Sequence, residues 1–378
     1  MFSLNDVLAA RLKVVVKIGT SLLADTAQGV NRDRIDRTAE SVAHLRSMGV
    51  QVAIVSSGAI GAGIGELRLG ERPKTIPEKQ AAAAVGQPIL MEAYEHAFRK
   101  QNLTIAQILL TKDDFVNRSR YLNVKNTFAA LFERGIIPII NENDTVAVEE
   151  IKLGDNDNLS ALVANLVEAG LLIILSDVDG LYSDDPTQNS NAKFIPLVEK
   201  ITPQIERLAK KRRSEFSTGG MITKLEAAKQ SIASGIAVII TNGTNPQAIE
   251  EIISGTYRGT LFLPLRSKLN VRKKWIGFVS DSKGTVVVDE GAKRAIVKRQ
   301  KSLLPSGVVD VRGEFAQRDT ITVLDDRGNE VAKGISGFSS LELIRIKGKK
   351  TAEIRKILNR TSGDEVIHRN NLVLTGEE

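Results

Sequence analysis

Two lysines of this sequence stand on glycine-containing segments, where their positive charge could meet a bound anion. Lys17 lies near the end of the apolar run VVVKIGTS, and Gly19 behind it lets backbone N–H groups approach an anion closely. Lys224 ends the segment STGGMITK at the expected start of a helix, where free N–H groups and the helix dipole favour negative charge. The second segment is a strong signal for an anion. The first is weak by itself, because ordinary turns share its composition.

Asparagine and aspartate are concentrated between residues 139 and 166, in two clusters around a short insertion. The first cluster, Asn141 to Asp144, follows an apolar run that we expect to be a buried strand, and the second, Asp155 to Asn158, precedes a helical pattern. Open α/β sheets bind ligands at such a junction between strand and helix. Capping and turn formation would need only one or two of these residues, so we favour a ligand site.

Two further turns carry polar groups at the ends of predicted strands. The segment SDVDGLYSDDP offers Ser176 and Asp177 for contact with a nucleotide, although its acidic residues are also common in turns or could hold a metal. The segment VSSGAIGAG contains glycines that do not complete a dinucleotide-binding fingerprint. Residues 56 to 58, which include Ser57, look more like a nest for a carboxylate.

Two lysines with an Asp/Asn cluster to orient them fit phosphoryl transfer, where catalysis is largely positioning and charge neutralisation. No side chain stands out as a general base. A hydroxyl acceptor would have to lose a proton, whereas a carboxylate acceptor is already an anion at neutral pH. The residues are therefore consistent with a kinase that converts a carboxylate to an acyl phosphate.

The composition excludes several other chemistries. The chain has 378 residues, 42% of them hydrophobic, which is enough for two or three domains. It has no cysteine, so disulfides, thiolate zinc sites and cysteine nucleophiles are excluded. With only three histidines, the sequence does not favour a histidine metal site. The N-terminal segment has no signal pattern, and no run approaches the ~20 apolar residues of a membrane span. We expect a cytoplasmic protein without a membrane segment.

Short apolar runs alternate with helical patterns over the first 265 residues. Near-continuous hydrophobicity predicts strands buried on both faces at Val14 to Ile18, Val52 to Val55, Ile105 to Leu110, Ile136 to Ile140, Leu171 to Leu175 and Ile236 to Ile240. Helices are predicted at Ile35 to Met48, Glu78 to Arg99, Tyr121 to Arg134, Leu159 to Glu168, Ile222 to Ser234 and Pro246 to Ile253. This alternation predicts an α/β fold with an open, mainly parallel sheet sandwiched by helices.

The composition changes after residue 265. A proline and five cationic residues predict a linker at 266–282, followed by a small β-rich module at 283–362 and a C-terminal tail at 363–378. Residues 266–378 contain 23 Lys and Arg against 15 Asp and Glu, a balance of +8, whereas residues 1–265 contain 29 against 30. Such a balance can indicate nucleic-acid binding. Without an aromatic-studded sheet or a recognition helix, a solvated basic face is the favoured interpretation.

Five segments in this order resemble the amino acid kinase family and, within it, the glutamate 5-kinase group: VVVKIGTS, VSSGAIGAG, INENDTVAVEEIKLGDNDNLSA, SDVDGLY and STGGMITK. The resemblance covers nearly the whole chain, because the β-rich module resembles the PUA domain of many of these enzymes. It implies the amino acid kinase fold for residues 1–265. It also implies ATP-dependent phosphorylation of the side-chain carboxylate of L-glutamate, the first step of proline biosynthesis.

The resemblance also implies roles for particular residues. Lys17 and Lys224 would neutralise the transferring phosphoryl group, and Asp157 would orient them. The glutamate-binding positions would be Ser57, Asp144 and Asn156. The ATP-binding positions would be Lys17, Gly19, Ser176, Asp177, Thr218, Gly219, Gly220, Met221, Ile222, Thr223 and Lys224.

The remaining expectations concern cofactors and partners. Magnesium would arrive with ATP rather than in a site of the protein's own. Members of the family are commonly inhibited by proline and form dimers or tetramers, so we expect a homo-oligomer. Two alternatives remain open: another family member, such as an N-acetylglutamate, aspartate or uridylate kinase, or an RNA-binding protein that acts through the PUA-like module.

Overall fold

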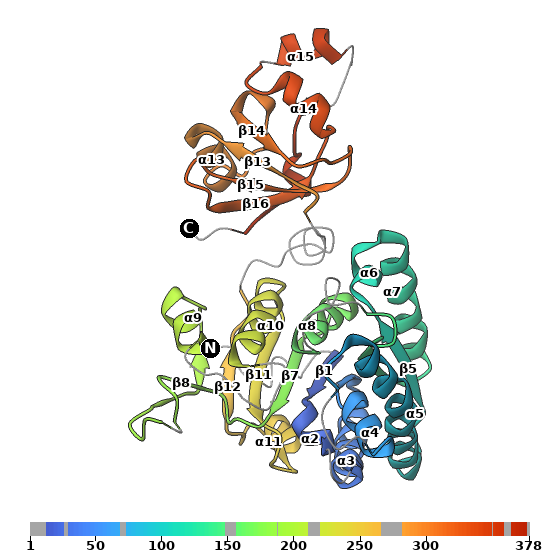
Figure 1. The fold of residues 1–378 in the computed structure, drawn as a ribbon. Helices are drawn as coiled ribbons and strands as arrows, with labels where there is room; N and C mark the ends of the chain where they lie inside the picture. Colours follow the sequence, from blue (N-terminus) through green and yellow to red (C-terminus); the bar gives the residue numbers. More distant parts are fainter. Residues whose placement is uncertain are drawn as a thin grey trace. The chain divides into compact units, whose positions relative to one another are not determined.

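The computed structural model describes residues 13–25, 29–68, 73–147, 156–186, 188–210, 220–265, 282–349, 351–358 and 364–375. The chain divides into two compact units, Met1–Lys268 and Leu269–Glu378, and each unit has its own sheet (Figure 1). Apart from its last residue, the linker predicted at 266–282 lies outside the described residues.

The first unit is built on an eight-stranded sheet. In chain order its strands are β1 (Lys13–Ile18), β4 (Gln51–Ser56), β5 (Ile105–Leu110), β6 (Ile137–Glu142), β7 (Leu171–Ser176), β10 (Leu197–Val198), β11 (Ala237–Asn242) and β12 (Gly259–Phe262). Their order in space is β10-β12-β11-β7-β1-β4-β6-β5, and every neighbouring pair is parallel except β11 with β12. The predicted sheet is confirmed. β10 and β12 were not predicted, because two and four residues are too few to show a periodic pattern.

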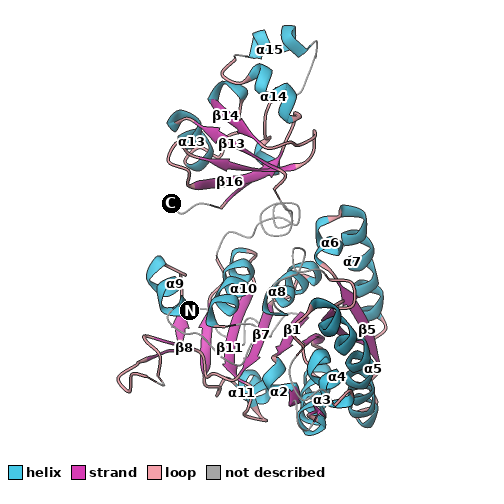
Figure 2. Cartoon of the chain, in the orientation of Figure 1, coloured by secondary structure: helices cyan, strands magenta, loops and turns pink. Residues whose placement is uncertain are grey.

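All six predicted helices are present, close to their predicted bounds (Figure 2). They are α3 (Arg32–Ser47), α5 (Ile76–Lys100), α7 (Arg118–Glu133), α8 (Asn156–Val167), α10 (Met221–Ala233) and α11 (Ala248–Ser254). The remaining elements of this unit were not predicted: α2 (Thr20–Leu23), β2 (Ala24–Asp25), β3 (Gly29–Val30), α4 (Ala59–Glu66), α6 (Lys112–Val116), β8 (Leu181–Tyr182), β9 (Phe194–Ile195) and α9 (Pro203–Lys210). Among the described residues of the chain, no helix has the length and apolar character needed to cross a membrane.

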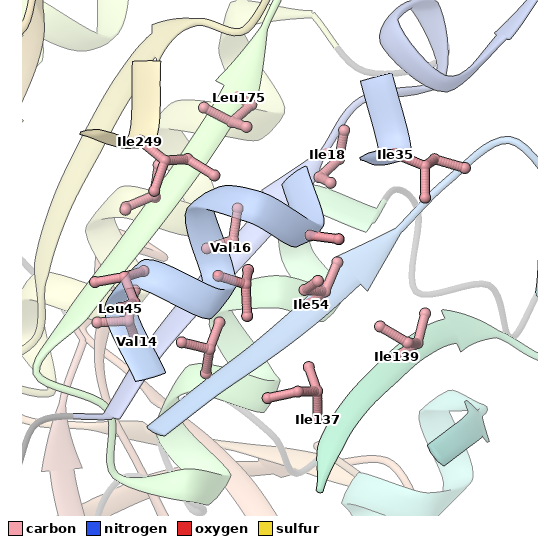
Figure 3. Close-up of a cluster of buried hydrophobic side chains, with 14 of the residues drawn as sticks. Val14, Val16, Ile18, Ile35, Leu45, Ile54, Ile137, Ile139, Leu175 and Ile249 are labelled. Atoms are coloured by element: carbon pink, nitrogen blue, oxygen red, sulfur yellow. The ribbon is translucent and has the colours of Figure 1, made fainter. Parts of the chain in front are cut away.

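One face of the sheet packs on α3 and α11 through buried aliphatic side chains (Figure 3). Val16 and Ile18 of β1 belong to this cluster, together with Leu45 of α3 and Ile249 of α11. Successive side chains of a strand point to opposite faces, so Lys17 points away from the cluster. The packing of this apolar face therefore fixes the direction of Lys17, the first of the predicted site residues.

Helices α4 and α5 approach each other so closely that only glycine fits at two positions. A Cβ atom on Gly63 would lie 1.8 Å from the carbonyl oxygen of Ala82, and one on Gly86 would lie 1.9 Å from that of Ala59. The residue before α4, Gly58, has φ of 100°, a conformation that side chains other than hydrogen disfavour. The glycines of the segment GAIGAG therefore serve a turn and helix packing, which explains why they do not complete a dinucleotide fingerprint.

The second unit contains a five-stranded sheet in the order β14-β13-β15-β16-β17. Its elements are β13 (Gly284–Val288), α13 (Glu290–Val297), η3 (Pro305–Gly307), β14 (Val308–Arg312), β15 (Thr320–Leu324), β16 (Glu330–Ile335), α14 (Ser340–Ile346), α15 (Thr351–Leu358), η4 (Arg369–Asn371) and β17 (Leu372–Leu374). The predicted β-rich module is confirmed. The segment predicted as a C-terminal tail is part of the folded second unit. Its strand β17 pairs with β16, and Val366 and Ile367 are fully buried in the core.

Candidate active site

The parallel register brings the ends of four strands to one edge of the sheet. Ile18 at the end of β1 pairs with Ser56 of β4 and with Leu175 of β7, and Ser176 pairs with Asn242 of β11. The turns that follow these strands therefore lie along the same edge. This is the carboxyl edge, at which open α/β sheets bind their ligands.

Lys17 and Asp157 form a buried ion pair between β1 and the first turn of α8. The Lys17 Nζ lies 2.6 Å from the Asp157 Oδ1, and the two side chains are 5% and 0% exposed. An ionised side chain at such a depth is costly without a partner of opposite charge. The ion pair explains how a strand that is otherwise aliphatic can carry a lysine.

A second lysine reaches the same carboxylate from α10. The Lys224 Nζ lies 3.2 Å from the Asp157 Oδ2, and the hydroxyl of Thr223 donates a hydrogen bond to that oxygen at 2.9 Å. The Lys224 side chain is only 7% exposed. The structure thus brings together all three predicted catalytic residues, with Asp157 between the two lysines.

Asp157 keeps its negative charge although its side chain is buried. Burial by itself would raise the pKa of this carboxyl group, but the nearby ammonium groups of Lys17 and Lys224 and the hydrogen bonds from Lys17 and Thr223 lower it to about 2. Asp157 is therefore ionised at neutral pH. An ionised carboxylate cannot donate a proton, so its contribution is to hold two positive charges at a fixed separation.

Three hydrogen-bonded amide side chains, which we call the amide group, include Asn156, the residue before Asp157. The Asn156 Nδ2 donates to the Ser57 Oγ at 2.8 Å, to the carbonyl oxygen of Ser56 at 3.0 Å and to the Asn141 Oδ1 at 3.0 Å. The Asn141 Nδ2 in turn donates to the Gln87 Oε1 at 2.9 Å. Two of the predicted substrate-binding residues, Ser57 and Asn156, are therefore in direct contact.

The third predicted substrate-binding residue, Asp144, lines a cavity of about 240 Å³. Gln87 lines the same cavity, as do Glu142 and Asn143. Gln87 also belongs to the amide group, so two hydrogen bonds connect a residue of this cavity with Asn156. A carboxylate and several amides around one small cavity provide partners for both an ammonium group and a carboxylate.

The predicted nucleotide-binding residues follow β1 and β7. A Cβ atom on Gly19 would lie 3.8 Å from the Lys17 Nζ, so a side chain at this position would crowd the ammonium group. Ser176 is buried, and its hydroxyl donates to the Asp177 Oδ1 at 3.0 Å. The backbone N–H of Gly243 donates to the carbonyl oxygen of Ser176 at 2.7 Å, which ties the turn after β7 to the turn after β11.

The remaining nucleotide-binding positions lie at the start of α10. Gly220 is the N-cap residue and gives the helix no side-chain cap, and the positive end of the helix dipole favours an anion at this position. Met221 is buried, whereas Ile222 is 37% exposed. Thr218 and Gly219 lie outside the described residues.

The predicted site residues did not include Gln87 and Asn141, although both belong to the amide group. Asn141 was noticed only as one member of a polar cluster. Gln87 stands in the helical stretch QAAAAVGQ, and its position on the buried face of α5 is a signal that could have identified it. In the described part of the chain, no group of three or more His, Asp or Glu side chains is placed to hold a metal ion.

Comparisons with known proteins give a consistent result. Residues 13–242 match the model of the amino acid kinase family, and residues 284–358 match that of the PUA domain. The glutamate 5-kinase of Geobacter sp. (strain M21) is 50% identical over 362 residues, which cover 96% of this chain and 97% of the relative. The glutamate 5-kinase of Moorella thermoacetica is 46% identical over 364 residues, which cover 96% of each chain.

Among solved structures, an isopentenyl phosphate kinase in complex with its substrate resembles this chain with a TM-score of 0.46 and 20% sequence identity. The similarity covers 66% of this chain and 99% of that kinase.

Proposed function

The chain belongs to the amino acid kinase family, and from this premise we propose that it transfers the γ-phosphoryl group of ATP to the side-chain carboxylate of L-glutamate. The products are L-glutamyl 5-phosphate and ADP, and the reaction is the first step of proline biosynthesis. The observation that carries this proposal is the pair of buried lysines held by Asp157 at the carboxyl edge of the sheet. The names and the near-complete coverage of the relatives supply the identity of the substrate.

The two lysines provide the charge that phosphoryl transfer needs. An oxygen of the glutamate carboxylate bonds to the γ-phosphorus while the bond from that phosphorus to the β,γ-bridging oxygen breaks, and ADP leaves with the electron pair. Negative charge on the transferring group and on the leaving oxygen is stabilised by Lys17 on one side and Lys224 on the other. Asp157 fixes both ammonium groups before the substrates bind, so little reorganisation is needed during the reaction.

The acceptor requires no general base in this arrangement. A glutamate carboxylate is ionised at neutral pH, and Asp157, with its lowered pKa and two lysine partners, is poorly suited to accept a proton. The cavity lined by Asp144 and Gln87 would hold the amino-acid part of the substrate, and hydrogen bonds connect Gln87 through Asn141 to Asn156. These neutral groups orient the carboxylate without competing for the charge of the lysines.

Magnesium would enter this site on the phosphates of ATP. Asp157 is the only fully buried carboxylate among the described residues of the first unit, and both of its oxygens are occupied by lysines. The described residues therefore offer magnesium no free buried carboxylate. The ion would neutralise part of the negative charge of these phosphates, as in other kinases.

Three further properties belong to the proposal on the strength of the family resemblance. The enzyme works in the cytoplasm, forms a dimer or tetramer, and is inhibited by proline. Light scattering after size-exclusion chromatography measures the assembly, and kinase assays with increasing proline measure the inhibition.

The proposed reaction is tested by trapping its product with hydroxylamine, which converts an acyl phosphate to a hydroxamate. The purified enzyme with ATP, magnesium and L-glutamate should give γ-glutamyl hydroxamate and ADP in equal amounts. N-acetylglutamate, aspartate and UMP serve as the competing acceptors. Equal turnover of any of these three, or no hydroxamate from glutamate, would refute the proposed specificity.

A further inference from the structure

Three donors converge on the carboxylate of Asp157, and they divide unevenly between its two oxygens. The Oδ1 atom has the Lys17 ammonium group at 2.6 Å. The Oδ2 atom has two donors, the hydroxyl of Thr223 at 2.9 Å and the ammonium group of Lys224 at 3.2 Å. Both of these donors come from the first turn of α10, whereas Lys17 comes from β1. The nearer donor to Oδ2 is therefore the neutral hydroxyl of Thr223, and Lys224 is the more distant one.

The hydroxyl of Thr223 has one hydrogen atom and two acceptors within reach. The second acceptor is the carbonyl oxygen of Gly220, at 3.0 Å, in the position where a threonine of a helix often bonds its own backbone. An ionised carboxylate is the stronger acceptor, and the bond to Asp157 is one of the causes that lower the pKa of this carboxyl group to about 2. The hydrogen therefore points to Asp157 and is not available to a phosphate, whose ionised oxygens can only accept.

The burial of Asp157 increases the importance of each donor to its oxygens. Its side chain is 0% exposed, so bulk water cannot replace a donor that is lost. Without the hydroxyl of Thr223, the Oδ2 atom would attract the neighbouring Lys224 ammonium group more strongly. The charge of Lys224 would then be less available to a second acceptor. In the proposed reaction, that second acceptor is the transferring phosphoryl group.

We propose that Thr223 is a positioning residue whose hydroxyl satisfies the Asp157 Oδ2, which leaves the charge of Lys224 available to the transferring phosphoryl group. The inference rests on the proposed function. It differs from the role that the family resemblance implies for Thr223, which is direct contact with ATP. The two roles have different consequences. A hydroxyl that acts through Lys224 loses its effect once Lys224 is replaced, whereas a direct contact with ATP persists.

The test is a double-mutant cycle on kcat, measured by the formation of hydroxamate at saturating ATP and L-glutamate. Thr223→Val keeps the shape of the side chain and removes the hydroxyl. This change alone should lower kcat by about tenfold or more, because a hydrogen bond to a charged group is lost, while KM for ATP stays near that of the wild type. In enzyme that already carries Lys224→Met, the same change should alter kcat by less than about twofold.

Thr223→Ser is the matched variant, because serine retains the hydroxyl. Its kcat should stay near that of the wild type. Ser231→Ala is the control: it removes a buried hydroxyl further along α10, and it should leave kcat as it was. Circular dichroism checks that each variant is folded before its kcat is compared. If Thr223→Val gives no soluble enzyme, Thr223→Ala removes the same hydroxyl and takes its place in the cycle.

Several results would overturn the inference while the proposed function stands. Thr223→Val could retain the wild-type kcat, or it could raise KM for ATP instead, as direct contact with the nucleotide predicts. An equal loss of kcat with and without Lys224→Met would show that Thr223 does not act through Lys224. An equal loss in Thr223→Ser and Thr223→Val would show that the hydroxyl is not what matters. No product from L-glutamate in the wild type would refute the proposed function and the inference together.

Discussion

Among the described residues, each unit of this protein contains one fully buried aspartate, and the two are stabilised in different ways. Asp325 in the second unit accepts hydrogen bonds from the backbone N–H groups of Arg327 and Asn329, within its own turn, and pairs with Lys293, whose side chain is 36% exposed. Asp157 in the first unit is held by two lysines that come from other elements and are themselves buried. The first arrangement stabilises a local turn, whereas the second places two positive charges at the carboxyl edge of the sheet, where we propose that ATP and glutamate bind.

The two aspartates share a lowered pKa, so the direction of the shift does not distinguish them. For Asp325 the largest cause is the hydrogen bond from Lys293, followed by a backbone N–H group. For Asp157 burial opposes the shift, and two buried ammonium groups overcome it. The difference lies in the position of the lysine partners: Lys293 is near solvent, while Lys17 and Lys224 are buried at the edge of the sheet where we propose that the substrates bind. A buried cation beside a ligand site is the better sign of catalysis.

The largest expected effect follows from removing one of these cations. Lys224→Met keeps most of the volume of the side chain but removes its charge from the transferring phosphoryl group. We expect kcat to fall by about a hundredfold to a thousandfold, because donors to a developing charge contribute on that scale. Steady-state kinetics measures the effect, and circular dichroism checks the fold. A folded variant with full kcat would show that Lys224 does not act on the phosphoryl group.

Removing the shared carboxylate should affect stability as well as activity. Asp157→Asn leaves Lys17 and Lys224 buried and uncompensated, so we expect the free energy of unfolding of the first unit to fall by about 3–5 kcal/mol. Urea denaturation measures it. A stability equal to that of the wild type would mean that the two lysines do not depend on Asp157. Binding of ATP should restore part of the loss, because phosphate then neutralises the lysines.

Acid should weaken the same interaction. A carboxylate whose pKa is lower in the folded state stabilises the fold above its unfolded pKa, near 4, and this contribution is lost as pH falls through the folded pKa of about 2. The stability difference between wild type and Asp157→Asn should therefore be constant above about pH 5 and shrink by about 2 kcal/mol below it. Denaturation curves between pH 2 and pH 7 measure the difference. A difference that grows on acidification would contradict the assignment.

The smallest effect on catalysis is expected from the other aspartate. Asp325→Asn weakens the turn between β15 and β16, so the second unit should unfold at a lower temperature. The kinase activity should remain within about twofold of the wild type, as for most changes distant from a site. Calorimetry and the hydroxamate assay measure the two properties on one sample. A loss of activity as large as that of Lys224→Met would abolish the distinction between the two aspartates.

The sequence predicted the parts of the fold that follow from long hydrophobic patterns. The six predicted strands and six predicted helices of the first unit are such parts. The three residues predicted to be catalytic, Lys17, Asp157 and Lys224, stand on distinctive segments, and the structure brings them into contact. The extra strands β10, β12 and β17 were missed because two to four residues show no period, and their place depends on partners far away in the chain. Helix α4 was missed because its glycines resemble a turn, although they allow close packing against α5.

The sequence predicted the charged residues of the candidate site better than its neutral residues. The contact of Asp157 with both lysines agrees with the roles implied by the resemblance. Lys224 was expected at the start of a helix, and it lies in the first turn of α10, where its side chain is buried. The position of Gln87 on the buried face of a helix was a signal, but its partner could not be assigned from sequence, because the contact with Asn141 joins residues 54 positions apart and exists only after α5 packs on the sheet.

The central claim, that a carboxylate oxygen of L-glutamate attacks the γ-phosphorus, is tested most directly with isotope-labelled substrate. The enzyme is given ATP, magnesium, hydroxylamine and L-glutamate that carries ¹⁸O in its side-chain carboxylate. Hydroxylamine attacks the acyl carbon, so the released phosphate keeps the oxygen that formed the bond to phosphorus. Mass spectrometry should find one ¹⁸O atom in each phosphate. Phosphate without ¹⁸O would show that water or another group is the acceptor, and the account of this site would be wrong.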